Sequence, residues 1–399
     1  MDADDELGAF RATFLAPEDG SVLAYLDGNS LGRPPVSTLD RLSDLVRRQW
    51  GTRLIRSWSE GWFELPEQIG DELGSVALGA APGQVILGDS TTVLLYKVLR
   101  AAVAARPGRR EIVTDVHNFP TDRYVVEGVA DELGCRIRWL WTDQAAGVTA
   151  RQLADVLGTD TAVVTLSHVA YRSAYLADMG ALTRLVHDAG ALTVWDLCHS
   201  VGSVPVELDA LGVDFAVGCT YKFLCGGPGS PAFAYVAARH QADLRQPIWG
   251  WIGRVDPFAM AQGYRPAAGM RALLSGTPPV LALAGVAEGV ALVAEAGIDR
   301  IRAKAMALAE MAVALTDSWL APHGVTLASP RDPAHRGAHV TISRHDAEDL
   351  AAELIAAGVI IDFRPPDGIR IGLAPLSTGF DELWRGMDAM RRILAHHEP

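Results

Sequence analysis

The fold is decided by residues 191–236, which read ALTVWDLCHSVGSVPVELDALGVDFAVGCTYKFLCGGPGSPAFAYV. Three runs in this stretch are rich in β-branched and aromatic residues, and each is predicted to be a strand: ALTVWD (191–196), DFAVGCTY (214–221) and PAFAYV (231–236). The runs are apolar throughout instead of alternating, which indicates strands that are buried on both faces. The first run ends in Asp196, and the second ends in Tyr221, directly before Lys222.

The same alternation of predicted strands and helices extends toward the N-terminus. Further strands are predicted at 85–88, 111–115, 137–140 and 162–168, with amphipathic helical segments at 151–158 and 178–190. Strand–helix–strand repetition at this spacing predicts an α/β protein with a mostly parallel, doubly wound sheet. Ligands of such sheets bind beyond the carboxyl ends of the strands.

Beyond Pro278 the pattern changes. Two long helical stretches are followed by the strand HVTISR (339–344), a short helix, a strand-rich region at 359–373 and a closing helix. Runs of helices and strands that no longer alternate regularly predict a separate, small α+β domain.

The composition excludes several classes of function. The chain carries 48 Asp and Glu residues against 35 Lys and Arg residues, a formal net charge of −13. This balance argues against a general nucleic-acid-binding protein and against docking on anionic membranes, both of which need basic patches. No apolar run is long enough for a transmembrane helix, and the acidic start MDADDELGAF does not resemble a secretory signal. We expect these first acidic residues to form a solvated tail.

The cysteines indicate a reducing compartment. Cys135, Cys198, Cys219 and Cys225 form no CxxC pair, so we expect free thiols in a cytoplasmic protein. No His and Cys cluster has the spacing of a zinc site, and no metal is expected.

The ends of two predicted strands carry the strongest chemical signal. A lysine in an apolar context is costly unless it is paired or used, and burial favours the neutral amine that Schiff-base chemistry needs. Lys222 provides such an amine, Asp196 at a neighbouring strand end can hold a pyridinium nitrogen, and Thr91 and Thr92 at a predicted helix start can bind a phosphate. These are the groups that a pyridoxal phosphate enzyme requires. The spacing alone is equally compatible with a structural salt bridge between Asp196 and Lys222.

The chain resembles the kynureninase family, fold-type-I pyridoxal phosphate enzymes, in this region and in an ordered set of blocks that covers nearly the full length. The blocks are YLDGNSLGRPP (25–35), LIRSW (54–58), GDSTTVLLYKVL (88–99), NFPTDRY (118–124), LSHVAYRS (166–173), GWIG (250–253), SGTPP (275–279) and DGIRIGLAPL (367–376).

The resemblance implies a role for individual residues. Lys222 is expected to bind the cofactor and carry protons, Asp196 to pair with its pyridine nitrogen, and Tyr221 to donate a proton. The remaining cofactor-pocket positions are Thr91, Thr92, Phe119, Asp122, Ser167 and His199 within the chain, with Tyr221 also near the phosphate, and Trp251 and Thr277 reaching in from a partner subunit. Arg370 matches the arginine that binds the substrate α-carboxylate, because a guanidinium fits planar oxygens. Trp58 is a candidate contact for an aromatic substrate or an ordinary packing residue.

The resemblance also implies the reaction. The expected activity is hydrolysis of the Cβ–Cγ bond of L-kynurenine to anthranilate and L-alanine, with pyridoxal 5'-phosphate, in a cytoplasmic homodimer of tryptophan catabolism and NAD biosynthesis. Arg254 stands where many bacterial members have histidine. It leaves open the same reaction on a 3-hydroxy or methylated kynurenine, whereas Gly276–Thr277 resembles the bacterial type that takes unsubstituted kynurenine. Cysteine desulfuration, transamination and a catalytically inactive binding protein are the remaining alternatives.

The resemblance and the strand pattern together suggest three segments. Residues 1–60 are expected to join the small domain and the dimer contacts, residues 61–290 to form the large cofactor-binding domain, and residues 291–399 to form the small α+β domain.

Overall fold

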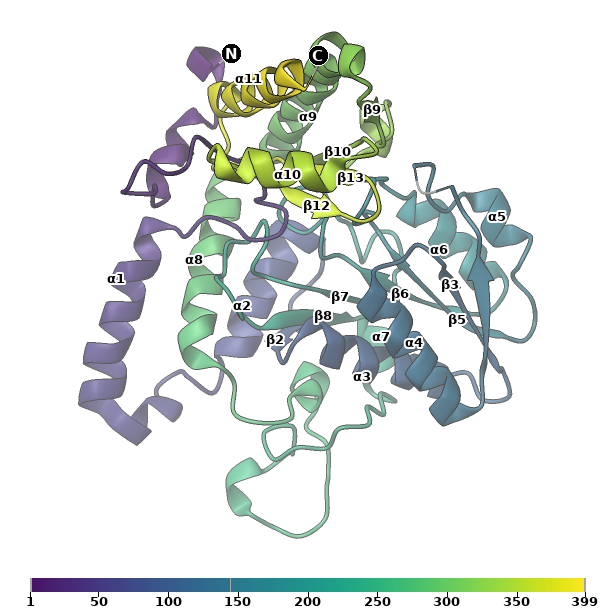
Figure 1. Ribbon diagram of the computed structural model, residues 1–399. Coiled ribbons are helices and arrows are strands. Elements are labelled where there is room, and N and C mark those ends of the chain that lie inside the picture. The colour runs from purple at the N-terminus through teal and green to yellow at the C-terminus, as the bar shows by residue number, and fades with distance from the viewer. Residues whose placement is uncertain (1, 144, 398–399) are drawn as a thin grey trace.

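A seven-stranded sheet lies at the centre of the computed structural model, which describes residues 2–143 and 145–397 (Figure 1). Met1 and residues 398–399, the outermost positions of two of the expected segments, lie outside the described residues. In spatial order the strands are β2 (Val85–Gly88), β8 (Ala232–Val236), β7 (Phe215–Gly218), β6 (Leu192–Asp196), β5 (Thr161–Ser167), β3 (Glu111–Asp115) and β4 (Arg136–Leu140). Only β8 runs antiparallel to its neighbours, so the predicted mostly parallel α/β sheet is confirmed.

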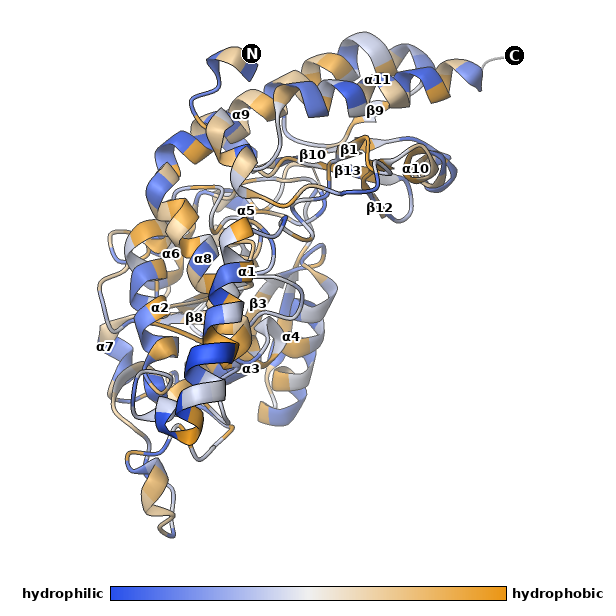
Figure 2. Ribbon diagram, turned by 90° about the vertical axis from the view of Figure 1, so that its left-hand side faces the viewer, coloured by the Kyte–Doolittle hydropathy of each residue, from blue (hydrophilic) through white to orange (hydrophobic). Residues whose placement is uncertain are grey.

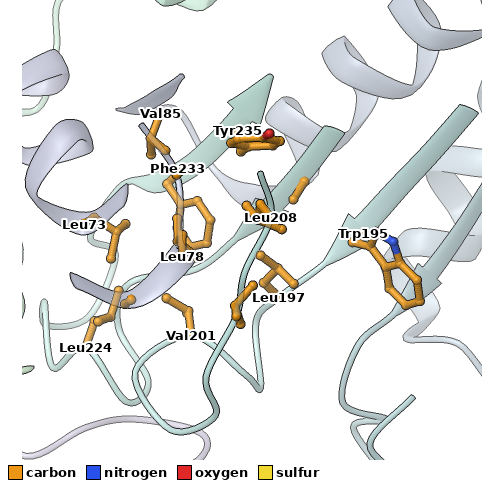
Figure 3. Close-up of a cluster of buried hydrophobic side chains, with 14 of the residues drawn as sticks. Leu73, Leu78, Val85, Trp195, Leu197, Val201, Leu208, Leu224, Phe233 and Tyr235 are labelled. Atoms are coloured by element: carbon orange, nitrogen blue, oxygen red, sulfur yellow. The ribbon is translucent and has the colours of Figure 1, made fainter. Parts of the chain in front are cut away.

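Helices cover both faces of this sheet. One face packs against α3 (Thr91–Ala104) and α4 (Pro120–Leu133), and the other against α2 (Leu65–Leu73), α5 (Ala150–Ala154), α6 (Met179–Asp188) and α8 (Val280–Ala296). The side chains of β8 show the division, because Phe233 and Tyr235 join the cluster on the α2 and α8 side while Val236 joins the other (Figure 3). Two buried faces explain why the strand sequences are apolar without alternation.

A smaller part of the molecule has its own sheet and core. Its four strands are antiparallel, in the order β12 (Asp362–Arg364), β13 (Gly368–Gly372), β10 (His339–Ser343) and β9 (Thr326–Leu327). It is covered by α9 (Ile298–Leu315), α10 (Ala347–Ala356) and α11 (Phe380–His396). Near the N-terminus, β1 (Ala24–Tyr25) pairs in parallel with β11 (Val359–Ile360), so both ends of the chain contribute to this part (Figure 1).

The acidic N-terminal residues do not form the solvated tail that their composition predicts. The Asp5 carboxylate is 2.7 Å from the Lys304 amine of α9, and both side chains are buried. The Asp2 carboxylate accepts hydrogen bonds from the backbone N–H groups of Phe380 and Asp381 at the start of α11. The prediction was wrong for these two residues because their partners lie about 300 or more positions further along the chain.

Two segments project from the body of the molecule. One is α1 (Val36–Asp44) with its continuation η3 (Leu45–Arg53) and η4 (Leu54–Trp58), and the other is the loop at 244–277, which lies at the bottom of Figure 1. Figure 2 shows that the tip of this loop is largely hydrophobic.

Among the described residues, no single helix is long and apolar enough to cross a membrane. The pair Val280–Ala296 and Ile298–His323, bent by 86°, meets the length and composition criteria only in combination.

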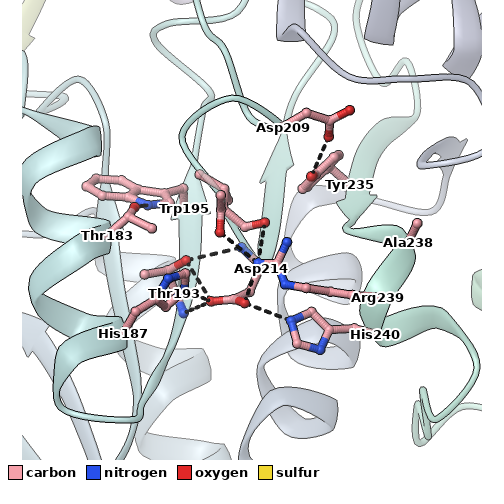
Figure 4. Close-up of polar contacts among 12 residues, drawn as sticks. Thr183, His187, Thr193, Trp195, Asp209, Asp214, Tyr235, Ala238, Arg239 and His240 are labelled. Carbon is pink, nitrogen blue, oxygen red and sulfur yellow. Dashed lines mark hydrogen bonds and ion pairs between the residues drawn. The ribbon is translucent and has the colours of Figure 1, made fainter.

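A polar network closes the end of the sheet opposite the carboxyl ends of the parallel strands. The buried Asp214 carboxylate accepts hydrogen bonds from the Thr193 backbone and hydroxyl, and from His187, Arg239 and His240, at 2.7 to 3.2 Å (Figure 4). Burial by itself raises the pKa of this carboxyl, but these hydrogen bonds outweigh it and hold the pKa well below the ordinary value. The network joins the beginning of β7 to β6, α6 and α7 (Ala238–Gln241).

Candidate active site

The main candidate site is a cavity of about 600 Å³ at the carboxyl ends of the central strands. Ser167 and Asp196 are register partners at the ends of β5 and β6, which explains why two distant sequence blocks meet there. The predicted site residues that line the cavity are Thr91, Thr92, Phe119, Asp122, Ser167, Asp196, His199, Tyr221, Lys222 and Thr277. Its position agrees with the rule that ligands of parallel sheets bind beyond the carboxyl ends of the strands.

Lys222 lies in the loop that follows β7. This strand ends at Gly218, three residues earlier than the sequence predicts, because the chain then turns into a loop that Thr220 closes by hydrogen bonds to Ser230 and Pro231. The Lys222 Nζ atom is 2.9 Å from His199 Nε2, so its partner is this imidazole instead of the Asp196 carboxylate. Burial, and then the nearby Lys222, lower the pKa of His199 well below its ordinary value. The imidazole is therefore neutral and its Nε2 can accept a hydrogen bond from the amine.

Two carboxyl groups face the cavity side by side. Asp196 ends β6, and its Oδ1 accepts a hydrogen bond of 2.6 Å from the Cys198 backbone N–H. Burial, and then the charge of Asp196, raise the pKa of Asp122 well above its ordinary value. In the described part of the chain, Asp122 Oδ2 is buried without a hydrogen-bond partner. A buried, unpaired carboxyl oxygen is costly, so this pair suits a cationic or N–H-bearing ring.

The start of α3 forms an anion-binding end of the cavity. Ser90 is the N-cap and its Oγ accepts a hydrogen bond from the Val93 N–H, while Thr91 and Thr92 are the first two helical residues. Their backbone N–H groups have no acceptor within the helix, and the helix dipole favours a negative charge at this position.

These features fit pyridoxal phosphate. The cavity has the volume of a small-molecule site, with a helix N-terminus for a phosphate, the Asp196 carboxylate for a ring nitrogen and the Lys222 amine for an aldehyde. Among the described residues, no group of three or more His, Cys, Asp or Glu side chains is arranged to hold a metal ion.

The structure adds residues that the sequence analysis did not select. Tyr171, Ser90 and Cys198 also line the cavity. Ser90 was recognisable, because a serine directly before a helical run is a preferred N-cap. The Tyr171 ring packs edge-on against Phe119 at 5.3 Å between centroids, a contact between two sequence blocks that no local pattern reveals.

Arg370 does not line the cavity. It is buried on β13, and its guanidinium donates to the Tyr171 carbonyl (2.7 Å) and Ser30 Oγ (2.8 Å) and pairs with Asp362 (2.5 Å). Its Nε is buried without a partner in the described part of the chain. Since Tyr171 lines the cavity, Arg370 lies directly behind its wall.

The N-terminal block YLDGNSLG connects this arginine to the lysine loop. Ser30 Oγ accepts a hydrogen bond from the Arg370 guanidinium, and the Gly32 N–H donates a hydrogen bond of 2.8 Å to the Tyr221 carbonyl. A Cβ atom on Gly32 would lie 2.2 Å from the Lys222 carbonyl oxygen, so only glycine allows this approach.

Trp58 and Trp251 also lie outside the cavity of the single chain. Trp58 packs edge-on against Trp62, and Trp251 lies on the projecting loop edge-on against Phe258. Arg254 is largely buried in the same loop, where it donates to the Gly263 and Asp256 carbonyls. Its guanidinium thus organises the loop instead of facing the cavity.

The chain is similar to known proteins over nearly its whole length. A family model described as the kynureninase C-terminal domain matches residues 301–390. A kynureninase from Pseudomonas fluorescens is 42% identical over 401 residues, covering 99% of this chain and 94% of the relative. One from Burkholderia pseudomallei (strain 1106a) is 40% identical over 399 residues with the same coverage.

Solved structures support the fold at lower identity. A cysteine desulfurase from Thermococcus onnurineus NA1 superimposes with a TM-score of 0.81 at 17% identity, covering 94% of this chain and 95% of the other. A C-DES variant with glycine covalently linked to its PLP cofactor gives a TM-score of 0.83 at 16% identity, with coverages of 96% and 98%. These likenesses confirm the fold-type-I architecture expected from the sequence.

Proposed function

The chain belongs to the kynureninase family, and from this premise we propose that it hydrolyses the Cβ–Cγ bond of L-kynurenine to anthranilate and L-alanine, with pyridoxal 5'-phosphate as cofactor. The observation that carries the proposal is the meeting of Lys222, Asp196 and the start of α3 on one cavity, in a chain 42% identical to a kynureninase over 99% of its length.

The residues of the cavity divide into holding groups and proton-moving groups. Lys222 would hold the cofactor aldehyde, Asp196 its ring nitrogen, and the N–H groups of Thr91 and Thr92 its phosphate, with Phe119 against the ring.

When bound, the cofactor supplies an electron sink for a carbanion at the substrate Cα. Lys222 Nζ takes the Cα proton, and the neutral His199, 2.9 Å away, orients this amine. Water adds to the γ-carbonyl of the substrate, so that Cγ leaves as the carboxylate of anthranilate when the Cβ–Cγ bond breaks. Tyr221, which also lines the cavity, then donates a proton to Cβ. Arg370, which lies directly behind the Tyr171 wall of the cavity, would bind the α-carboxylate.

The experiment combines substrate choice with one substitution. The purified holoenzyme is mixed with L-kynurenine, with 3-hydroxy-L-kynurenine and with L-cysteine, and aminobenzoate, alanine and sulfide are measured. We expect alanine and anthranilate from kynurenine, and a loss of at least about 1000-fold in Lys222→Arg, which keeps the charge but removes the primary amine. Faster release from the hydroxylated substrate, sulfide from cysteine, or an active Lys222→Arg protein contradicts the proposal.

We propose, in addition, a cytoplasmic homodimer that acts in tryptophan catabolism by the kynurenine pathway and supplies NAD biosynthesis. Large apolar side chains support the dimer, because they are exposed on both projecting segments: Trp50, Leu54, Ile55, Trp249, Phe258 and Met260. Exposed apolar patches of this kind mark interaction surfaces. In the dimer, Trp251 and Thr277 serve the pocket of the partner subunit, and Trp58 contacts the aromatic substrate.

We keep the three expected segments as part of the proposal. The pairing of β1 with β11 supports assigning residues 1–60 to the small domain with residues 291–399. The strands of the seven-stranded sheet all fall within 61–290, the proposed cofactor-binding domain.

A further inference from the structure

Lys97 is a buried charged residue that the proposed reaction does not use. Its side chain is fully buried on α3, and its ammonium donates to Asp89 Oδ2 (2.6 Å), to the Leu273 carbonyl (2.6 Å) and to Ser275 Oγ. An ammonium has three N–H donors, so all of them are satisfied. A buried amine whose three donors are all occupied has none left for a ligand. Its effect on the site must therefore pass through the groups to which it donates.

Two of the segments that Lys97 joins border the phosphate end of the cavity. Asp89 lines the cavity directly before Ser90, Thr91 and Thr92, and Leu273 and Ser275 lead to Thr277, which also lines it. Asp89 has a φ of +46°, which is unfavourable for a residue with a side chain. Such a conformation persists only where its surroundings impose it, and the ion pair with Lys97 is one such constraint.

The second segment also carries the GWIG turn. A Cβ atom on Gly250 would lie 1.8 Å from the Ser275 carbonyl oxygen, and one on Gly253 would lie 2.4 Å from that of Leu274. The turn that bears Trp251 therefore packs its backbone directly on residues 274–275. Whatever fixes Leu273 and Ser275 thus fixes both Thr277 and Trp251.

We propose that Lys97 is a positioning residue for the cofactor phosphate. It sets the position of the α3 start, and with it the N–H groups of Thr91 and Thr92 that would hold the phosphate, relative to residues 273–277. In the dimer it would also place Trp251 and Thr277 for the partner's phosphate. This inference rests on the proposed cofactor and not on the proposed substrate.

The test measures cofactor binding to the apoenzyme instead of catalysis. Dissociation constants for pyridoxal phosphate and for pyridoxal, which lacks the phosphate, are measured by absorbance titration of wild type and Lys97→Met. We expect the affinity for pyridoxal phosphate to fall about 10- to 100-fold, while the affinity for pyridoxal changes by less than about twofold. Lys97→Arg retains the charge and is expected to recover part of the preference for the phosphorylated form.

Lys304→Met is the matched control. Lys304 is also buried and paired with an aspartate, Asp5, but it lies in the smaller part of the molecule. Its loss is expected to lower the melting temperature and to leave the ratio of the two dissociation constants unchanged. If Lys97→Met does not fold, Ser275→Ala removes one acceptor only and is expected to give a smaller loss confined to the phosphorylated form.

Equal losses for pyridoxal phosphate and pyridoxal, or an unchanged ratio, overturn the proposal. Because binding is measured, the result stands even if the holoenzyme fails to cleave kynurenine. Failure of the proposed reaction and failure of this inference are therefore distinguishable.

Discussion

The chain contains few lysines, and their structural surroundings differ. The sequence contains three, Lys97, Lys222 and Lys304, among 35 basic residues. Lys97 and Lys304 are buried and paired with aspartates, while Lys222 lines the cavity beside His199. All other basic residues are arginines, whose high pKa prevents them from acting as nucleophilic amines at neutral pH. Lys222 is therefore the lysine whose amine faces the cavity and can act in covalent chemistry.

The contacts of Arg370 lead to a prediction about substrate binding. If Arg370 binds the α-carboxylate, Arg370→Lys loses the planar fork and is expected to raise the KM for kynurenine about 10- to 100-fold, with a smaller change in kcat. Steady-state kinetics of the holoenzyme measure both. A kynurenine analogue without the α-carboxylate is expected to react equally poorly with wild type and variant.

Arg364→Lys is the control for this prediction. Arg364 pairs with Asp362 at 2.8 Å, the same carboxylate that Arg370 contacts, so it tests loss of packing around Asp362 without loss of the carboxylate-binding group. A KM for Arg370→Lys within about twofold of wild type, or an equal effect of Arg364→Lys, would remove Arg370 from the substrate site.

At the scale of the elements, the two ends of the sheet have different roles. The carboxyl ends of β5 and β6 carry Ser167 and Asp196 at the cavity, whereas the Asp214 network ties β6, β7 and α7 together at the other end. The polar groups at the carboxyl ends of the strands face the cavity, and those at the opposite end, around Asp214, form hydrogen bonds with one another. Substitutions at this opposite end should therefore affect stability and not the reaction.

Asp214→Asn tests this separation. We expect the free energy of unfolding at pH 7 to fall by about 2–4 kcal/mol, because a buried carboxylate with several charge-assisted hydrogen bonds is lost, while kcat/KM stays near that of wild type. The pKa of Asp214 is lowered in the folded state. Its stabilising contribution is therefore complete above the unfolded-state pKa, near pH 4, and is lost as the pH falls further. Urea unfolding at pH 7, 5 and 3 should show the difference between wild type and variant shrinking only at the lowest pH.

The exposed ion pair between Asp317 and Arg331 provides the comparison. Asp317→Asn is expected to change the free energy of unfolding by less than about 1 kcal/mol, because solvent screens such pairs. An Asp214→Asn protein that is as stable as wild type, or that loses catalysis while remaining stable, would show that the two ends of the sheet are not independent.

The sequence predicts the elements better than it predicts their ends and their distant contacts. Strands β3, β5 and β6 lie within one residue of the predicted ranges because their two buried faces leave a clear apolar run. The end of β7 was placed three residues too late, since the hydrogen bonds of Thr220 that turn the chain involve residues about ten positions further on. The pairing of Asp5 with Lys304 joins residues that are far apart in the sequence, and no local pattern carries such information.

For the candidate site too, the sequence predicted which residues line the cavity better than it predicted their contacts. The family resemblance located the residues of the cavity wall because they fall in quoted sequence blocks, at strand ends and at a helix start. It did not reveal that Lys222 pairs with His199, that Arg370 is held by Asp362, or that Lys97 connects two of those blocks. Each of these contacts depends on how elements pack, which the order of residues along the chain does not specify.

At the scale of the whole molecule, each pocket depends on the chain whose projecting loop completes it. Thr277 lines the cavity of its own chain, whereas Trp251 lies outside it on the projecting loop, where 39% of its surface is exposed. A homodimer in which the loops cross would place Trp251 at the partner's cavity. A twofold axis then requires that both pockets are shared in the same way.

Mixing two inactive variants decides between these arrangements. Lys222→Ala removes the reactive amine, and Trp251→Ala combined with Thr277→Ala removes the loop contacts. In a crossed mixed dimer, one pocket combines an intact Lys222 from one chain with an intact loop from the other, so unfolding and refolding an equimolar mixture should restore about a quarter of the wild-type activity. If each loop serves its own chain, every pocket in the mixture carries a defect and no activity returns. Mixing each variant with itself gives the baseline, and light scattering shows whether dimers have re-formed.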